Sequence, residues 1–445
     1  MKFRLKRELG LFEATLYGIG IIIGAGIYAL IGEATALAGN SVWLSFIIGA
    51  IIASFTGLSY AELSTMFPKA AAEYVYVRKA SGSRFWAFLV GWLIVFTGVV
   101  SAATVALGFS GYFQAFAGPF LEKSLPITIT KIVNSDVLVS MILIGVLSYI
   151  NFRGMKESST FNIIFTSIEI FGLVLIILLA IGSYGKVNYF YSPNGFKGVF
   201  SAAALIFFAY VGFEDIANIV EETKKPKTNI PYAFILAVGF TAALYTLTSI
   251  ATVSLADWKE ISLVKNPLAF VAEKSFLGGA AGVVISFAAL FATLSTVLLI
   301  LVVSSRMVYG MAREKSLPEE LSLIHERTRT PWLAVIAVMI LSMVFVFFGD
   351  ISLVANITSL GAFITFIAVN LSLIWLRYTM PKVKRAFRVP GNIGNYPVVA
   401  FLGVFSCLFM IFQFDWNLIL FGLAVVAIGA VVYKLFIKRM KRFNV

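Results

Sequence analysis

The segment that decides the fold lies close to the N-terminus and reads YGIGIIIGAGIY at residues 17–28. It is apolar enough to lie inside a bilayer, yet four of its residues are glycine, and each glycine weakens a helix by roughly 1 kcal/mol relative to alanine. A second apolar stretch, FFAYVGFED at residues 207–215, carries a glycine and then two carboxylates. Both patterns predict membrane helices that are interrupted near their middle.

The composition of the whole chain is that of a membrane protein. Of its 445 residues, 60% are hydrophobic and 13% are charged, whereas soluble domains carry roughly a quarter charged residues. A helix needs about 20 apolar residues to cross the hydrocarbon core. We therefore predict an all-α polytopic membrane protein, with residues 1–445 forming a single transmembrane domain of about twelve helices. The expected spans lie near 13–34, 42–66, 86–116, 137–152, 160–183, 199–221, 231–255, 280–311, 331–349, 353–377, 396–414 and 417–437.

The positions of the basic residues predict the orientation of the chain. With a cytoplasmic N-terminus, 28 of the 35 Lys and Arg residues fall in cytoplasmic stretches, as the positive-inside rule requires. We therefore expect a multi-pass protein of the cytoplasmic membrane with both termini cytoplasmic. The net charge of +13 is then a topology signal and not a nucleic-acid site. One His and one Cys provide no metal-ligand set, and we expect no metal and no cofactor.

The two interrupted segments are the first and the sixth of the expected spans. Because five is an odd number of helices, two five-helix units would lie in opposite orientations, as in an inverted repeat. Paired glycine-interrupted segments in two such halves indicate a substrate site near the midplane of the bilayer. We expect repeat one at about 10–185, repeat two at about 197–380 and two extra helices at about 394–440.

An interrupted membrane helix also predicts what its site binds. Unwinding frees backbone N–H and C=O groups, which cannot stay unsatisfied in lipid. A zwitterion satisfies both kinds, because its carboxylate suits a half-helix N-terminus and its ammonium suits free carbonyls. The alternative is that the glycines only permit close helix packing, but their correspondence between the two halves favours a site.

Several motifs resemble those of the amino acid–polyamine–organocation (APC) superfamily. They cover roughly the first 320 residues, and the rest of the chain matches by topology. The matching stretches are GIIIGAGIY (20–28), LSYAELSTMFP (58–68), EYVY (73–76), FFAYVGFE (207–214), EETKKP (221–226) and SSRMVYGMAR (304–313).

The resemblance implies a twelve-helix fold, in which two inverted five-helix repeats precede two C-terminal helices and helices 1 and 6 are unwound in the membrane. It implies secondary active transport of an amino acid by alternating access. The backbone at 24–26 would bind the substrate carboxylate, carbonyls at 21–22 and 208–209 would bind the ammonium, and aromatic side chains would shape the pocket and gate. The substrate-binding residues implied in this way are Ile21, Ile22, Gly24, Ala25, Gly26, Phe208, Ala209, Tyr210, Gly212 and Phe213.

Polar residues at membrane depth are the candidates for ion coupling. Many family members carry a lysine in a fifth-span pattern resembling F-T-x-x-K, where this chain has FTSIE and places Glu169. Ionisable groups at this depth are functional by default, so we predict a proton or cation site at Glu169, with a structural role as the alternative. Glu214 is a candidate for holding the unwound region or a gate. Ser295 and Thr296 are candidates for binding Na⁺ or substrate, although such hydroxyls often bond their own helix.

Other functions fit the sequence less well. A membrane enzyme would need clustered catalytic carboxylates or a metal set, and a channel is usually built by repeating a pore helix around an axis. Among transporters, a polyamine or other organic-amine carrier and an amino acid exchanger remain alternatives. With only Glu169 and Glu214 as expected acidic groups near the cavity, a neutral, small or apolar amino acid is the favoured substrate. Glu62 lies near the cytoplasmic end of its span, where a salt bridge or snorkelling of the side chain is expected.

Overall fold

The computed structural model describes residues 9–69, 71–124, 135–217, 219–220, 223–264, 266–348 and 351–443. Glu221 and Glu222 of the EETKKP motif lie outside this part. Helices dominate the described residues, and their one sheet is a two-residue antiparallel pairing of β1 (Asn392–Ile393) with β2 (Tyr396–Pro397).

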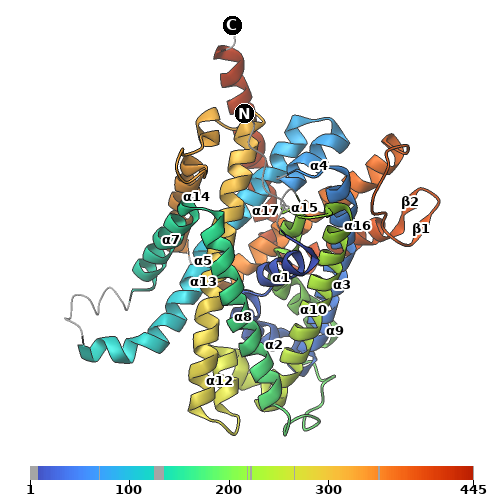
Figure 1. Ribbon diagram of the computed structural model, residues 1–445. Helices are drawn as coiled ribbons and strands as arrows, with labels where there is room; N and C mark the ends of the chain where they lie inside the picture. Colours follow the sequence, from blue (N-terminus) through green and yellow to red (C-terminus); the bar gives the residue numbers. More distant parts are fainter. Residues whose placement is uncertain are drawn as a thin grey trace.

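The helices follow one another along the chain (Figure 1). The α-helices are α1 (Leu11–Ile22), α2 (Ala25–Ala38), α3 (Val42–Met66), α4 (Ala72–Ser81), α5 (Arg84–Ser124), α7 (Asp136–Arg153), α8 (Met155–Leu179), α9 (Gly195–Ile206), α10 (Pro226–Leu255), α11 (Trp258–Leu263), α12 (Pro267–Glu273), α13 (Gly279–Arg313), α14 (Trp332–Phe345), α15 (Ile351–Thr379), α16 (Val398–Ile411) and α17 (Trp416–Phe443). The 3₁₀ turns are η1 (Gly39–Ser41), η2 (Phe207–Ala209), η3 (Phe213–Ala217), η4 (Glu319–Ser322) and η5 (Val346–Phe348).

Each of the twelve expected apolar segments contains a helix. In the described part, eight helical stretches are long and apolar enough to cross a bilayer, and four apolar helices are shorter. The structure explains why two of these helices are short: α1 ends at a break in the first span, and α14 continues into the 3₁₀ turn η5. The prediction of an all-α polytopic membrane protein is confirmed.

The outer surface of the helices is apolar. Large side chains such as Ile142, Phe171, Ile340, Phe405 and Leu423 are exposed on α7, α8, α14, α16 and α17. Monomeric soluble proteins rarely expose contiguous apolar surface on this scale, whereas lipid tails solvate it. The exposed apolar residues are therefore those expected to face the hydrocarbon core.

The interrupted segments lie at the centre of the bundle. α13 packs along α5, α10 packs along α3, α1 packs against α10, and α2 packs against α9. In Figure 1, α4 and the end of α17 lie at one end of the molecule, and α12 lies at the other. The start of the described chain is tied to the connection before α10, because Lys224 N–H donates to the Leu9 carbonyl at 2.7 Å.

Candidate functional site

The first span is broken at two residues in extended conformation, Ile23 and Gly24, between α1 and α2. α13 crosses this break. The Ala25 N–H donates to Thr296 Oγ1 at 2.9 Å, and the same hydroxyl donates to the Ala292 carbonyl at 2.7 Å. A Cβ on Gly24 would come 2.1 Å from Thr296 Oγ1, so only glycine permits this approach of α13 to the break.

The sixth span is broken over a longer stretch. α9 ends at Ile206, η2 adds one tight turn, and the chain then passes through Gly212, which has a φ of 118°. This is a conformation that other residues rarely adopt. The Gly212 N–H donates to Glu214 Oε2 at 2.8 Å, so the carboxylate satisfies one backbone group that unwinding has freed.

The two breaks touch each other through glycine. A Cβ on Gly26 would come 2.5 Å from Ala209 Cα, and a Cβ on Gly212 would come 2.6 Å from Ile21 Cγ2. The sequence prediction that the first and sixth spans are interrupted at corresponding places therefore agrees with their geometry. At Gly26 the two backbones lie directly against one another, and Gly212 packs on the side chain and carbonyl of Ile21.

Tyr245 of α10 holds the two breaks together. Its hydroxyl lies 2.8 Å from the Ile22 carbonyl at the end of α1 and 3.2 Å from the Ala209 carbonyl in η2. A phenol has one proton to donate, so the two carbonyls share it. This residue was missed from the sequence, where it is one tyrosine among 17, and its partners lie far away along the chain.

A cavity with about 110 Å³ of space for the centres of water-sized molecules lies beside the breaks. Most of its wall is apolar, and hydroxyl groups and carboxylates are interspersed. The predicted site residues that line it are Ile21, Ile22, Gly24, Ala25, Gly26, Phe208, Ala209, Gly212, Glu214 and Thr296. Its wall on α13 runs from Thr296 to Met307, and Glu73 of α4 also contributes, so the cavity extends from the breaks toward the α4 end of the molecule.

Tyr210 and Phe213 lie behind the wall of this cavity and not on it. The Tyr210 hydroxyl donates to the Phe46 carbonyl at 2.9 Å, and the Phe213 ring packs on Phe366 with centroids 5.1 Å apart. Both side chains are fully buried. Phe366 of α15 lines the cavity in their place.

Glu169 and Ser295 are not among the residues that line the cavity, although the Glu169 carbonyl accepts a hydrogen bond from Tyr28 of α2 at 2.8 Å. Ser295 Oγ donates to Glu169 Oε1 at 2.5 Å, and Glu169 is fully buried. Its second carboxylate oxygen has no hydrogen-bond partner among the described residues. Because Ser295 and Thr296 are neighbours on α13, Glu169 is linked through two side chains to the Ala25 amide at the break.

Glu73 was not selected from the sequence as a site residue, although it belongs to the EYVY motif. It is the second residue of α4, is 2% exposed and accepts a hydrogen bond from Tyr60 at 3.1 Å. Burial raises the pKa of its carboxyl to about 7, against the opposing effect of its hydrogen bonds. Glu73, Tyr60 and Glu214 all line the α4 end of the cavity.

Comparison with known proteins places the chain in a family. The sequence profile of the amino acid permease family matches residues 9–437. The branched-chain amino acid permease BcaP of Bacillus subtilis is 30% identical over 99% of this chain and 95% of its own length. The methylthioribose transporter of the same organism is 29% identical over 99% of this chain and 95% of its own length. The mitochondrial cationic amino acid transporter 3 of Arabidopsis thaliana is 30% identical over 82% of this chain and 61% of its own length.

Each of these relatives is named as a permease or a transporter, which confirms the prediction that the chain is not an enzyme. The profile match covers almost the entire chain and includes both interrupted spans. The chain belongs to the amino acid permease family of the APC superfamily.

Proposed function

We propose that this protein is a secondary active transporter that moves an amino acid across the cytoplasmic membrane by alternating access. The observation that carries the proposal is the meeting of two broken helices at one cavity. Backbone groups exposed at such breaks can bind both ends of a zwitterion. The amino acid permeases and transporters among the relatives support the same substrate class. We extend the proposal to two inverted repeats, at about 10–185 and 197–380.

The backbone divides into an anion-binding side and a cation-binding side. The first turn of α2 begins at Ala25 and directs N–H groups out of the helix start, where the substrate carboxylate would bind. In an unbroken helix the Ala25 amide would bond the Ile21 carbonyl. Here it bonds Thr296, so the Ile21 carbonyl loses its helical donor. We propose that this carbonyl and that of Phe208 bind the ammonium, since Tyr245 already donates to Ile22 and Ala209.

Phe208 is the proposed gate. It lines the main cavity and also a second cavity of about 10 Å³, which lies beside Ala29 and Leu30 of α2. The ring therefore separates the substrate space from a small void further along α2. If both termini are cytoplasmic, as the distribution of basic residues indicates, the main cavity is open toward the cytoplasm, and Phe208 closes the outward path.

The side-chain part of the cavity favours an apolar amino acid. Ile300, Val303 and Met307 lie on one face of α13 and line the space between the breaks and α4. An apolar side chain that enters this space gains about 25 cal/mol per Å² of surface removed from water. The substrate class is thus a neutral amino acid with an apolar side chain, in line with the name of the branched-chain relative.

A cationic amino acid or another organic amine is the second candidate, and one observation favours it. Three carboxylates, Glu73, Glu214 and Asp215, line the cavity. Glu73 and Glu214 would lie near the tip of a long cationic side chain. The cationic amino acid transporters among the relatives carry this substrate in their names.

Proton coupling through Glu169 is part of the proposal. A proton on its carboxyl changes the hydrogen bond with Ser295, and the adjacent Thr296 caps the break. Loading and release of a proton would thereby alter the position of the break. Glu169→Gln retains a polar group of similar size but cannot exchange a proton, so it should retain binding and lose uptake driven by a pH gradient.

The test is uptake of radiolabelled substrate by purified protein in proteoliposomes. The panel comprises leucine, isoleucine, valine, arginine, lysine and putrescine, each with and without an inward proton gradient or a sodium gradient. Saturable uptake of the apolar amino acids supports the first candidate, and preference for arginine or lysine supports the second. Absence of saturable uptake of every compound, from protein that remains folded, would remove the proposal.

A further inference from the structure

A third cavity lies apart from the substrate site, between the end of α15 and the segment that connects α15 to α16. It provides about 230 Å³ for the centres of water-sized molecules, well above the roughly 30 Å³ that one water occupies in the liquid. Its wall consists of Arg377, Pro381, Val383, Arg385, Arg388 and Asn395, which we call the arginine pocket. These lining residues include three guanidinium groups and no carboxylate.

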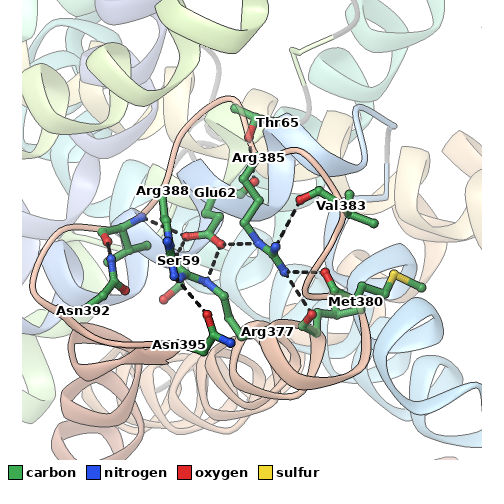
Figure 2. A network of polar contacts seen from close by, with 12 residues as sticks. Ser59, Glu62, Thr65, Arg377, Met380, Val383, Arg385, Arg388, Asn392 and Asn395 are labelled. Carbon is green, nitrogen blue, oxygen red and sulfur yellow. Dashed lines mark hydrogen bonds and ion pairs between the residues drawn. The ribbon is translucent and has the colours of Figure 1, made fainter.

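Glu62 of α3 is the counter-charge behind the pocket, and it forms ion pairs with two of the pocket's arginines (Figure 2). Oε1 accepts from Arg377 Nε at 2.7 Å and lies 2.9 Å from Arg385 Nε. Oε2 accepts from Arg377 Nη2 and from the Val389 N–H at 2.8 Å. A carboxylate offers about four lone-pair sites. Three of them accept hydrogen bonds, and Arg385 adds an ion pair without a hydrogen bond. The salt bridge expected for Glu62 is therefore present.

The remaining donors distinguish the three arginines. Arg385 is held mainly by the backbone, because its terminal nitrogens bond the carbonyls of Val383, Leu376 and Met380. Its Nε faces Glu62 as an ion pair and makes no hydrogen bond among the described residues. Arg377 is 2% exposed, and its Nη1 is buried without a partner among the described residues. Arg388 bonds the Gly394 carbonyl and Asn395 through Nη2. The pocket thus holds two unbalanced positive charges and at least one unused buried donor.

This arrangement is costly unless something binds in the pocket. A buried donor without a partner costs about 1–3 kcal/mol, and more when it is charged. Burial lowers the pKa of the Arg385 guanidinium, Glu62 raises it, and the neighbouring Arg377 and Arg388 lower it again. Guanidinium groups in a cluster suit a tetrahedral oxyanion, because each presents N–H donors in a fixed fork.

We propose that the arginine pocket is a binding site for a phosphate-type oxyanion, held between Arg377 and Arg388 at the membrane end of α15. Two sources supply this chemistry: a free phosphate-bearing solute, or the phosphate of an anionic lipid headgroup at the surface of the bilayer. Either oxyanion would accept a hydrogen bond from Arg377 Nη1 and balance the positive charge that Glu62 does not neutralise. The site would fix the connection between α15 and α16 to α3, independently of substrate.

Thermal unfolding of the full-length protein in a non-ionic detergent tests the proposal. Phosphate or sulfate should raise the apparent Tm by roughly 2 °C or more relative to chloride at equal ionic strength, since a ligand of the folded state stabilises it. Arg388→Gln should abolish the rise. Lys384→Gln removes the same charge from an exposed residue of the same loop that does not line the pocket, and should keep the rise.

A lipid arm distinguishes the two sources. The same proteins are compared in nanodiscs of phosphatidylcholine alone and of phosphatidylcholine with phosphatidylglycerol. Stabilisation by phosphate in detergent assigns the site to a free oxyanion. Stabilisation by phosphatidylglycerol alone, again lost in Arg388→Gln, assigns it to a headgroup. A wild-type protein that responds to neither, or an Arg388→Gln protein that responds like the wild type, would overturn the proposal.

Discussion

The approach of α13 to the break in the first span gives a prediction that a double-mutant cycle can test. In Gly24→Ala, the new Cβ would lie 2.1 Å from Thr296 Oγ1, more than 1 Å inside an ordinary contact. α13 must move away, or the Thr296 side chain must turn. Turning breaks its bond to the Ala25 N–H and costs about 1–3 kcal/mol, and moving the helix costs a similar amount through overpacking.

The cycle separates this clash from a general effect of the substitution. Thr296→Ala alone loses the cap on Ala25 and should lower the free energy of unfolding by about 1–2 kcal/mol. In the Thr296→Ala background no oxygen meets the new Cβ, so Gly24→Ala should cost less than about 0.5 kcal/mol. The coupling energy between the two positions is then of order 1–2 kcal/mol, the range expected for residues in contact.

Two further variants control the measurement. Thr296→Ser keeps the hydroxyl, so Gly24→Ala should remain costly beside it. Gly239→Ala in α10 adds a Cβ that meets nothing within 4 Å, and it should leave stability equal or slightly higher. Stability is read from unfolding in detergent, and transport from uptake in proteoliposomes, which Gly24→Ala should reduce. If Gly24→Ala lowers the free energy of unfolding equally in the wild-type and Thr296→Ala backgrounds, the clash with Thr296 is refuted.

Three other predictions concern buried polar groups. Burial raises the pKa of Glu73 from 4.5 to about 7. Between these two pH values the folded protein holds a proton that the unfolded chain has already released. The free energy of unfolding should therefore fall as the pH rises through this range, by at most about 3 kcal/mol. In Glu73→Gln, unfolding measured from pH 5 to 8 should lack this fall, and an unchanged profile would contradict the assignment. Tyr245→Phe removes the hydroxyl shared by the carbonyls of Ile22 and Ala209. The apparent Tm should drop by the equivalent of about 1 kcal/mol, and stabilisation by substrate should weaken. Substrate binding equal to that of the wild type would show that Tyr245 does not support the site. Glu62→Gln leaves buried guanidinium charge without its carboxylate. It should lower the free energy of unfolding by about 3–5 kcal/mol. A decrease of less than about 1 kcal/mol would mean that the ion pair is dispensable.

The parts of the site that could be predicted from the sequence are those encoded locally. Glycines at 24, 26 and 212 stand in apolar runs long enough to span the bilayer, and a helix weakened there must satisfy its backbone elsewhere. This reasoning needs no knowledge of which helices are neighbours. It located the backbone of both breaks, and the cavity lies beside them.

The side chains around the breaks could not be placed in the same way, because unwinding changes their direction. Tyr210 and Phe213 are three residues apart and would share one face of a regular α-helix. In the structure, a 3₁₀ turn precedes Tyr210, and Gly212 takes a φ of 118° between the two residues. The helical periodicity is therefore lost at these two residues, which the family resemblance assigned to the pocket, and both rings turn into the core.

Contacts between distant segments were also beyond the sequence. Ser295 and Thr296 are adjacent on α13, and both were candidates for binding an ion or substrate. Side chains at neighbouring helical positions point about 100° apart, so one bonds Glu169 and the other caps the break. Which hydroxyl takes which role depends on how α13 is rotated against α8 and α2, and tertiary packing sets that rotation.

The hydroxyls of Ser295 and Thr296 together suggest how proton binding at Glu169 would be coupled to substrate binding at the break. The Ser295 hydroxyl contacts a carboxyl that has one unpaired oxygen, and the Thr296 hydroxyl contacts the amide that begins α2. If protonation of Glu169 reverses the direction of its hydrogen bond with Ser295, α13 can rotate slightly, and Thr296 moves with it. The Ala25 amide would then return toward the Ile21 carbonyl, the same group proposed to bind the substrate ammonium. Competition for that one carbonyl would couple proton and substrate without direct contact between them.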